Sequence, residues 1–255
     1  MKKLKVAAIQ AASVARNADD KWAGVDVSHA LDLLDRAHEM GADFACFPEL
    51  YPLIGEEELR ARARRHSMYV IAGIAQGPRQ RWFNTSTLIS PDGEIVGRQT
   101  KNYPTAGEID NGVVAGDTFQ VFDTEFGRVG IVICADFAFF NDGVETCKRQ
   151  NADIIFNPAV WFALSEAFPH TIAGRHLEYS VPVIGVNLAR PTVERENPLF
   201  PPAGGYSTIC VPPPITDLDT LWDWFRTKAG GIDSTAGFIR TLGPGEKIVV
   251  AEIDI

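Results

Sequence analysis

Four polar residues follow predicted strands or lie in the loop between two of them: Glu49, Lys101, Glu108 and Cys134. A thiol nucleophile needs a base to take its proton, and a cation or amide N–H groups to hold an oxyanion. Glutamate, lysine and cysteine can supply these parts without a histidine. If the strand ends meet at one edge of a sheet, the four residues predict nucleophilic catalysis through a cysteine.

Each of the four residues has a simpler explanation when it is taken alone. A free cysteine is among the most buried residue types, so Cys134 could be a small apolar core residue. Glu49, which follows Pro48, could cap a helix. Lys101 and Glu108 could be solvated, as most lysines and glutamates are. It is the joint arrangement that favours a catalytic site over these alternatives.

Cys134 belongs to the central stretch of the chain, residues 128–140. The apolar run 129–133 follows a turn-like sequence at 124–127 and predicts a strand that is buried on both faces. Cys134 would then stand at the end of this strand, where sheet-based enzymes commonly hold reactive groups.

The first third of the chain alternates between strand and helix patterns. Apolar residues recur at helical spacing from Val27 to Ala37 and stop before Gly41, a candidate for the C-terminal cap. Asp19 and Asp20 offer an N-cap for this helix. The other expected elements are strands at 5–12, 43–48 and 68–75 and a helix at 55–65. Strand, helix and strand in succession indicate an α/β architecture.

A hairpin interrupts this alternation, so we expect mixed sheets. Two strands, 84–90 and 95–100, flank the turn sequence 91–94. The segment 101–117 has no sustained periodicity and is expected to be a long loop of the kind that often carries function.

The rest of the chain carries shorter patterns. The expected strands are 118–124, 154–158, 181–187 and 204–211, and the expected helices are 144–150 and 167–179. Residues 234–240 and 247–253 should pair around a turn at 242–245. Before them, the segment Leu221–Lys228 holds two tryptophans and a phenylalanine, for which a capping helix or a subunit contact is favoured over a ligand site.

Composition predicts one domain, residues 1–255, with a large core. The 24 basic and 33 acidic residues give a formal net charge of −9 without a basic face, which argues against nucleic acid or an anionic membrane as a partner. Four scattered cysteines without C-x-x-C spacing indicate neither a zinc site nor disulfides. Without a signal-peptide pattern or a long apolar span, the expected location is cytoplasmic.

Three regions together resemble the signature regions of the nitrilase superfamily, the carbon-nitrogen hydrolases. These regions are FPEL at 47–50, Lys101 after an NTS-type hairpin, and GIVICAD at 130–136. Further similar segments follow in the family's order: FNPAVW at 156–161, GRHLEYSVPVIGVN at 174–187, GGYSTI at 204–209 and VVAEIDI at 249–255. The resemblance covers nearly the whole chain, and the combination is specific although no single motif is.

The resemblance implies a four-layer α-β-β-α sandwich, an α/β fold with two mixed β-sheets, that forms a homodimer or a higher homo-oligomer. The roles it implies are general base for Glu49, oxyanion stabiliser for Lys101, nucleophile for Cys134, and support of the lysine and substrate for Glu108. The residues expected beside the substrate are Ala135, whose N–H would be the second oxyanion donor, Asp136, Trp161 and Phe162. Trp161 and Phe162 could instead pack in the hydrophobic core, away from the substrate.

The reaction that follows is hydrolysis of a small linear amide or N-carbamoyl compound through a cysteine thioester, without a cofactor or a metal. A nitrilase acting on a small nitrile, and a catalytically silent homologue that serves as a binding or scaffold protein, are the alternatives. The run CADFAFFNDGVE at 134–145 lacks the arginine and the proline that many members carry there, and residues 102–104 replace a frequent histidine-containing run. Substrates with a free carboxylate are therefore disfavoured.

Overall fold

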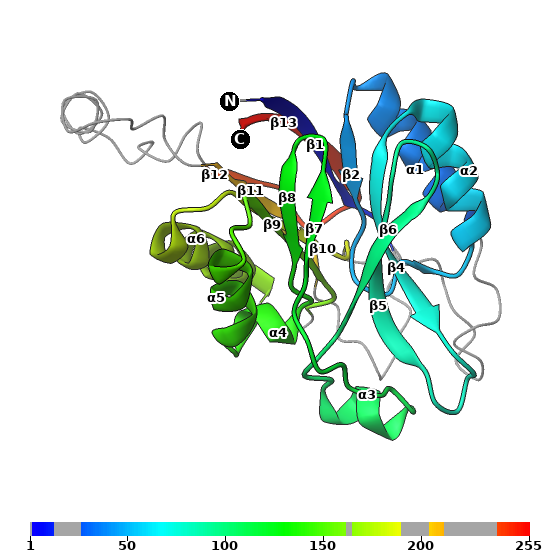
Figure 1. Cartoon of the computed structure of the whole chain (residues 1–255), viewed down its shortest axis with the longest axis vertical. Coiled ribbons are helices and arrows are strands. Elements are labelled where there is room, and N and C mark those ends of the chain that lie inside the picture. The colour runs from blue at the N-terminus through cyan, green and yellow to red at the C-terminus, as the bar shows by residue number, and fades with distance from the viewer. Residues whose placement is uncertain (1, 13–26, 162–164, 190–203, 212–238) are drawn as a thin grey trace.

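The computed structural model describes residues 2–12, 27–161, 165–189, 204–211 and 239–255. Two mixed β-sheets face each other, and helices cover the outer side of each sheet (Figure 1). The predicted α/β fold, a four-layer α-β-β-α sandwich, is therefore correct. In the described part of the chain, no helix is long and apolar enough to cross a membrane.

The first sheet has seven strands in the order β13-β1-β2-β4-β5-β6, with β3 paired to β4. Its strands are β1 (Lys3–Gln10), β2 (Phe44–Cys46), β3 (Pro52–Leu53), β4 (Tyr69–Gln76), β5 (Phe83–Ile89), β6 (Ile95–Thr100) and β13 (Lys247–Asp254). Strands β1, β2 and β4 run parallel, whereas β5, β6 and β13 join them antiparallel. The predicted hairpin is the β5–β6 pair.

The second sheet has six strands in the order β12-β11-β10-β9-β8-β7. Its strands are β7 (Val121–Thr124), β8 (Gly127–Ile131), β9 (Ile154–Ala159), β10 (Val183–Asn187), β11 (Thr208–Cys210) and β12 (Ile239–Thr241). The central strands β8, β9 and β10 are parallel and completely buried from Val129 onward, which explains why their sequences are almost continuously apolar.

Two helices cover each sheet (Figure 1). They are α1 (Val27–Glu39) and α2 (Glu56–His66) on the first sheet, and α5 (Asp142–Arg149) and α6 (Phe168–Tyr179) on the second. Apolar positions at helical spacing in α1, such as Ala30, Leu34 and Ala37, are buried against the first sheet, so this amphipathic helix was predictable. Its N-cap candidates, Asp19 and Asp20, lie outside the described residues.

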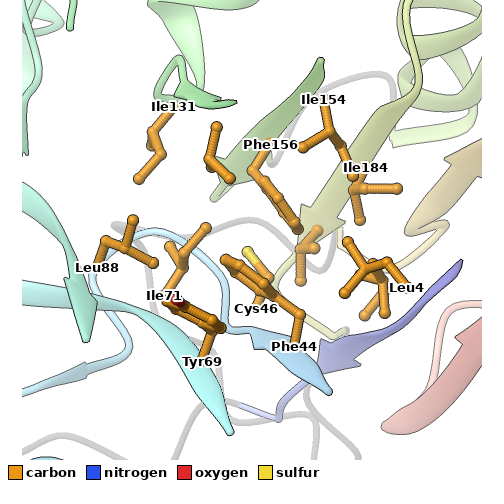
Figure 2. Close-up of a cluster of buried hydrophobic side chains, with 14 of the residues drawn as sticks. Leu4, Phe44, Cys46, Tyr69, Ile71, Leu88, Ile131, Ile154, Phe156 and Ile184 are labelled. Carbon is orange, nitrogen blue, oxygen red and sulfur yellow. The ribbon is translucent and has the colours of Figure 1, made fainter. Parts of the chain in front are cut away.

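The core between the sheets is made of apolar side chains that meet from both sides (Figure 2). The ring of Phe44 in β2 stacks on Phe156 in β9, with the ring centroids 5.0 Å apart, and on Tyr69 in β4 at 5.2 Å. We call this the inter-sheet core. It contains Leu4, Val6, Ala8, Phe44, Cys46, Tyr69, Ile71, Leu88, Phe122, Val129, Ile131, Ile133, Ile154, Phe156, Ile184, Val186, Ile209, Ala251 and Ile253.

The predicted closing pair of strands is wrong. Strand β12 pairs with β11 in the second sheet, whereas β13 pairs with β1 in the first, over eight residues. The residues between them cross from one sheet to the other, and the Gln10 side chain at the end of β1 donates to the carbonyl oxygens of Gly243 and Gly245. A turn-like sequence does not distinguish a hairpin from such a crossing, because the choice depends on partners far away in the chain.

Two local predictions also need correction. The segment 101–117 contains a short helix, α3 (Ala106–Asp110), which is too short to show periodicity. Strand β8 ends at Ile131, although backbone bonding to β9 continues until Cys134 N donates to Pro158 O at 3.0 Å. The aromatic segment Leu221–Lys228 lies outside the described residues, so its role stays a prediction.

Candidate active site

Three charged side chains from different elements meet in the interior. Lys101 Nζ lies 2.7 Å from Glu49 Oε1 and 2.7 Å from Glu108 Oε2. The residues Glu49 and Lys101 are only 2% and 1% exposed, respectively. Charged groups are found at this depth when they are paired and hydrogen-bonded, because burial of an unpaired charge is strongly unfavourable. The structure thus brings together the two glutamates and the lysine that the sequence singled out.

Glu49 follows β2 and is held by the main chain of the opposite sheet. Its Oε2 accepts a hydrogen bond from the Val160 N–H at 2.9 Å. The next residue, Leu50, has φ 56°, so the chain turns sharply just after the glutamate. Gly73 in β4 makes room for this turn, because a Cβ there would lie 2.3 Å from the Leu50 nitrogen. The Glu49 side chain thus reaches from the end of β2 to the main chain that follows β9 in the second sheet.

Glu108 is fixed by the helix that carries it. It is the third residue of α3, and its Oε2 accepts hydrogen bonds from the Thr105 N–H at 2.8 Å and the Thr105 hydroxyl at 2.9 Å. The Thr105 hydroxyl in turn accepts from the Glu108 N–H, which completes a capping box. The threonine and the spacing of three were visible in the sequence, but the loop prediction missed them.

Asn84 is a site residue that the sequence reasoning missed. Its Nδ2 donates hydrogen bonds to Glu49 Oε1 and to Glu108 Oε1, each at 2.8 Å. The side chain is fully buried in β5, and the Asn84 carbonyl accepts from the Lys101 N–H. The sequence offered little signal, because Asn84 is followed in β5 by three further polar residues, Thr85, Ser86 and Thr87.

Cys134 lies between β8 and the short helix α4 (Ala135–Ala138), three residues beyond the strand end. Its backbone has φ 45° and ψ −107°, an unusual conformation for a residue other than glycine. The bend is held by the Phe137 and Ala138 N–H groups, which donate to the Cys134 carbonyl. No described residue accepts a hydrogen bond from the Ala135 N–H, so this donor is available beside the thiol.

The thiol of Cys134 is protonated at rest. Burial and the negative charge of Glu49, helped by the hydrogen bond with that carboxylate, raise its pKa well above the usual range of a cysteine. Lys101 lowers the pKa, but its effect is outweighed. This direction agrees with the expected role of Glu49, a base that takes the thiol proton during the reaction.

Lys101 and Glu108 keep their charges in the same site. Burial opposes the charge of Lys101, but Glu49, Cys134 and Glu108 outweigh it and hold the lysine pKa above its usual value. Burial likewise opposes the charge of Glu108, and the nearby Lys101 cation with the Thr105 and Asn84 hydrogen bonds brings its pKa below the usual value. The lysine is therefore a permanent cation between carboxylates.

Asp136, expected beside the substrate, binds the main chain that follows the lysine. Its Oδ2 accepts from the Asn102 N–H and its Oδ1 from the Tyr103 N–H, both at 2.8 Å. Complete burial raises the pKa of Asp136 to about 7, although the two N–H groups and Lys101 act in the opposite direction. This carboxylate therefore connects the helix after Cys134 to the segment after Lys101.

Trp161 is half-buried near the thiol, whereas Phe162 lies outside the described residues. The Trp161 indole packs edge-on against Phe168 at 5.5 Å and tilts against Phe139 at 5.9 Å. The backbone N–H of Trp161 donates to Asn187 Oδ1 at 2.8 Å, a second polar contact that the sequence reasoning missed. Both of the suggested positions for Trp161, core and pocket wall, are compatible with this packing.

The described residues contain no group of three or more His, Cys, Asp or Glu side chains that could hold a metal ion. His176 is a buried packing residue whose Nδ1 lies 2.7 Å from the Val181 carbonyl, and burial lowers its pKa. The polar groups that meet at the site are the two glutamates, the lysine and the asparagine, beside the thiol.

A family model described as carbon-nitrogen hydrolase matches residues 5–254. Among curated proteins, the chain is 26% identical to a pantetheinase of Canis lupus familiaris over 164 residues, 60% of this chain and 31% of that protein. It is 27% identical over 168 residues to a deaminated glutathione amidase of Synechocystis, 54% of this chain and 61% of that protein. It is also 27% identical over 152 residues to a nitrilase of Pyrococcus abyssi, 52% of this chain and 57% of that protein. These matches span less than two thirds of each relative's own length.

Solved structures share the fold at lower identity. Nit3 of Saccharomyces cerevisiae superposes with a TM-score of 0.76 at 18% identity, over 99% of this chain and 90% of that chain. A mutant of the amidase from Nesterenkonia sp. AN1, with the acetamide moiety of fluoroacetamide added covalently at its active site cysteine, superposes with a TM-score of 0.76 at 15% identity. That match covers 98% of this chain and 90% of the amidase chain.

Proposed function

This chain belongs to the carbon-nitrogen hydrolase family, and we propose that it is a thiol hydrolase that cleaves a non-peptide carbon–nitrogen bond of a small linear amide or N-carbamoyl compound. The observation that carries the proposal is the buried cluster in which Lys101 Nζ bonds both Glu49 and Glu108 at 2.7 Å, next to the Cys134 thiol. A cluster of buried, mutually perturbed ionisable groups is costly to maintain, which favours a function over a purely structural role.

In the first step, Glu49 takes the thiol proton while the sulfur attacks the carbonyl carbon. A carbon–sulfur bond forms, and the π electrons of the carbonyl move to its oxygen. Lys101 has three N–H donors, two of which bind Glu49 and Glu108, so the third can bind this oxyanion together with the Ala135 N–H. Since the thiol is protonated at rest, its deprotonation belongs to this step.

In the next steps, Glu49 returns the proton to the nitrogen as the carbon–nitrogen bond breaks. Ammonia or an amine leaves, and a thioester on Cys134 remains. A water molecule, deprotonated by the same carboxylate, attacks the thioester and releases the acid and the thiol. Covalent catalysis of this kind replaces one difficult step by two easier ones. Glu108 keeps the lysine in place through its own 2.7 Å ion pair.

The surroundings of the thiol favour a substrate without a free carboxylate. The run 134–145 lacks the arginine and the proline that many family members carry there, and it has phenylalanines at residues 139 and 140. Phe140 stacks on Tyr103 with the ring centroids 3.9 Å apart, and Phe139 contacts Trp161. Aromatic faces of this kind bind apolar or neutral groups better than a carboxylate.

A nitrilase activity is the second candidate, because the similarity to the nitrilase of Pyrococcus abyssi is as high as that to the amidases. The same thiol could add to a nitrile carbon, and the outcome would depend on whether nitrogen is retained or lost. A silent homologue that works as a binding or scaffold protein is disfavoured, because the polar cluster is complete.

We test the proposal by measuring ammonia and amine release from a panel of small amides, ureido acids and nitriles, with Cys134→Ala as the paired control. We expect turnover of an uncharged amide or ureido compound that disappears in the variant. Equal turnover by both proteins would contradict the thiol mechanism. Silence of both proteins on the whole panel would favour the binding or scaffold function, and turnover of nitriles alone would favour the nitrilase.

We further propose a homodimer or higher homo-oligomer that works in the cytoplasm on a small molecule. All four cysteines are free, which is typical of a reducing compartment. Light scattering coupled to size-exclusion chromatography measures the oligomeric state, and a monomeric mass would contradict this part of the proposal.

A further inference from the structure

The cluster of Glu49, Lys101 and Glu108 contains more acidic than basic groups. Two carboxylates, Glu49 and Glu108, share one ammonium group, Lys101, so the cluster carries one negative charge in excess. The side-chain exposures are 2% for Glu49 and Lys101 and 16% for Glu108, so water screens this charge poorly. Two carboxylates that share a site normally favour protonation of one of them.

Asn84 lies between the two carboxylates, where a second cation could balance their charge. One nitrogen, Asn84 Nδ2, donates to an oxygen of each carboxylate, at 2.8 Å in both cases. An amide nitrogen carries two hydrogens, so both are used for the two glutamates. The reverse orientation would direct the amide oxygen at two carboxylates and is excluded by repulsion.

This orientation of the Asn84 amide leaves its oxygen without a hydrogen bond to any described residue. Its Oδ1 is buried and has no hydrogen-bond partner in the described part of the chain. A buried acceptor without a partner destabilises a fold, and such groups in native proteins require an explanation. Glu49 would keep Lys101 and Val160 as donors without Asn84, and Glu108 would keep Lys101 and Thr105. The fold alone therefore does not explain this asparagine.

We propose that Asn84 is a positioning residue that holds both Glu49 and Glu108 beside a single lysine and directs Glu49 toward the Cys134 thiol. This inference rests on the thiol hydrolase function proposed above. The hydrogen bond from Asn84 contributes to the lowered pKa of Glu108. The other ionisable groups facing the cluster are Cys134 and, from α4, Asp136.

The test uses Asn84→Leu, which keeps the size of the side chain but removes both donors and the unpaired oxygen. A second variant, Asn84→Asp, places a third carboxylate beside the one lysine. Ser86→Ala is the matched control, because Ser86 is two residues further along β5, 1% exposed, and has a hydroxyl without a partner. The Glu49→Gln variant serves as the reference for loss of the base.

Two experiments are run as a function of pH. The first measures the rate of alkylation of Cys134 by iodoacetamide, and the second measures kcat and KM for the best amide. For Asn84→Leu we expect the acidic limb of both profiles to move up by about one pH unit, with about a 10-fold loss on the acid side that falls mainly on kcat. For Asn84→Asp we expect a larger loss, about 100-fold, since the added charge opposes ionisation. Ser86→Ala should match the wild type.

The melting temperature separates a role in the site from a role in the fold. We expect Asn84→Leu to melt within a few degrees of the wild type, because it also removes the unpaired oxygen. Wild-type profiles in both Asn84 variants would overturn the inference and leave the proposed function intact. If Glu49→Gln hydrolyses the best amide as fast as the wild type, the proposed function itself fails.

Discussion

The inter-sheet core and the polar cluster at its edge are both largely buried but are stabilised by different forces. Phe44 and Phe156 in the core are fully buried, as is Asn84 in the cluster. The core side chains in Figure 2 contact one another through carbon atoms, so removal of apolar surface from water stabilises them. In the cluster, each polar side chain depends on hydrogen bonds with the others.

This difference predicts how the two regions respond to substitution. A core residue can be exchanged for another of similar volume at a small cost, because its contacts are not directional. A cluster residue has specific partners, and its loss leaves a buried charge or donor unpaired. Substitutions in the core should therefore change stability and preserve activity per folded molecule, and substitutions in the cluster should change activity first.

The largest effect is expected for Cys134→Ala. The neutral thiol contributes little to folding, so the unfolding midpoint in urea should change little, whereas kcat should fall by about a factor of 10⁴ or more. Cys147→Ala is the matched control, because Cys147 is a fully buried thiol of α5 that packs against the second sheet. It should lose about 1 kcal/mol of stability and keep its activity. The opposite pattern would contradict the contrast between the two regions.

Lys101→Met tests whether the cluster also contributes to stability. The variant leaves two buried carboxylates without their cation, so we expect a loss of about 3–5 kcal/mol in the free energy of unfolding, together with loss of activity. Lys247→Met, at an exposed position of β13, is the control and should behave as the wild type. Denaturation in urea measures both variants. Wild-type stability of Lys101→Met would show that the glutamates do not need the lysine.

Phe156→Ala measures the core side of the comparison. The deleted ring stacks on Phe44, so the expected loss is about 3–5 kcal/mol from lost burial and the cavity left behind. Activity per folded molecule, measured well below the melting temperature, should stay within about twofold. A kcat that falls as far as in the Cys134 variant would mean that core packing and catalysis are not separable here.

The contribution of Asp136 to stability should depend on pH. Its pKa is raised to about 7 in the folded chain, against 3.8 for an ordinary aspartate, so between about pH 4 and 7 the folded state holds a proton that the unfolded state has lost. The contribution of Asp136 to stability is therefore present at low pH and falls as pH rises through this window, by up to about 4 kcal/mol. Urea denaturation measures the free energy of unfolding of the wild type and of Asp136→Asn across this range. The value for the wild type minus that for the variant should fall as pH rises. An exposed control, Asp110→Asn, should show no such trend.

The smallest effect is expected at the surface. Arg175 Nη1 and Glu178 Oε2 form an ion pair of 2.8 Å, three residues apart on α6. Such pairs contribute about 0.2–0.5 kcal/mol, so Arg175→Ala should change the unfolding free energy by no more than that at low salt. A loss as large as that of Lys101→Met would remove the distinction between buried and exposed charges.

Much of the fold could be predicted from the sequence because local pattern and burial agree there. The amphipathic spacing of α1, the apolar runs of β8 and β9 and the β5–β6 hairpin all appear in the structure near their expected bounds. The closing hairpin could not be predicted. Its two strands are both regular, but their partners, β11 and β1, are set by contacts far away in the chain.

The sequence by itself determined which residue types are available for chemistry: a cysteine after an apolar strand, a glutamate after FPEL's proline, a lysine after a hairpin and a second glutamate seven residues later. The tertiary structure alone decided their charges and partners. Burial and the Glu49 carboxylate set the protonated state of Cys134, and Asn84 became part of the site because β5 places it between two carboxylates. The physical reason is that a pKa and a hydrogen bond depend on distance and desolvation, which arise when strands distant in sequence pack together.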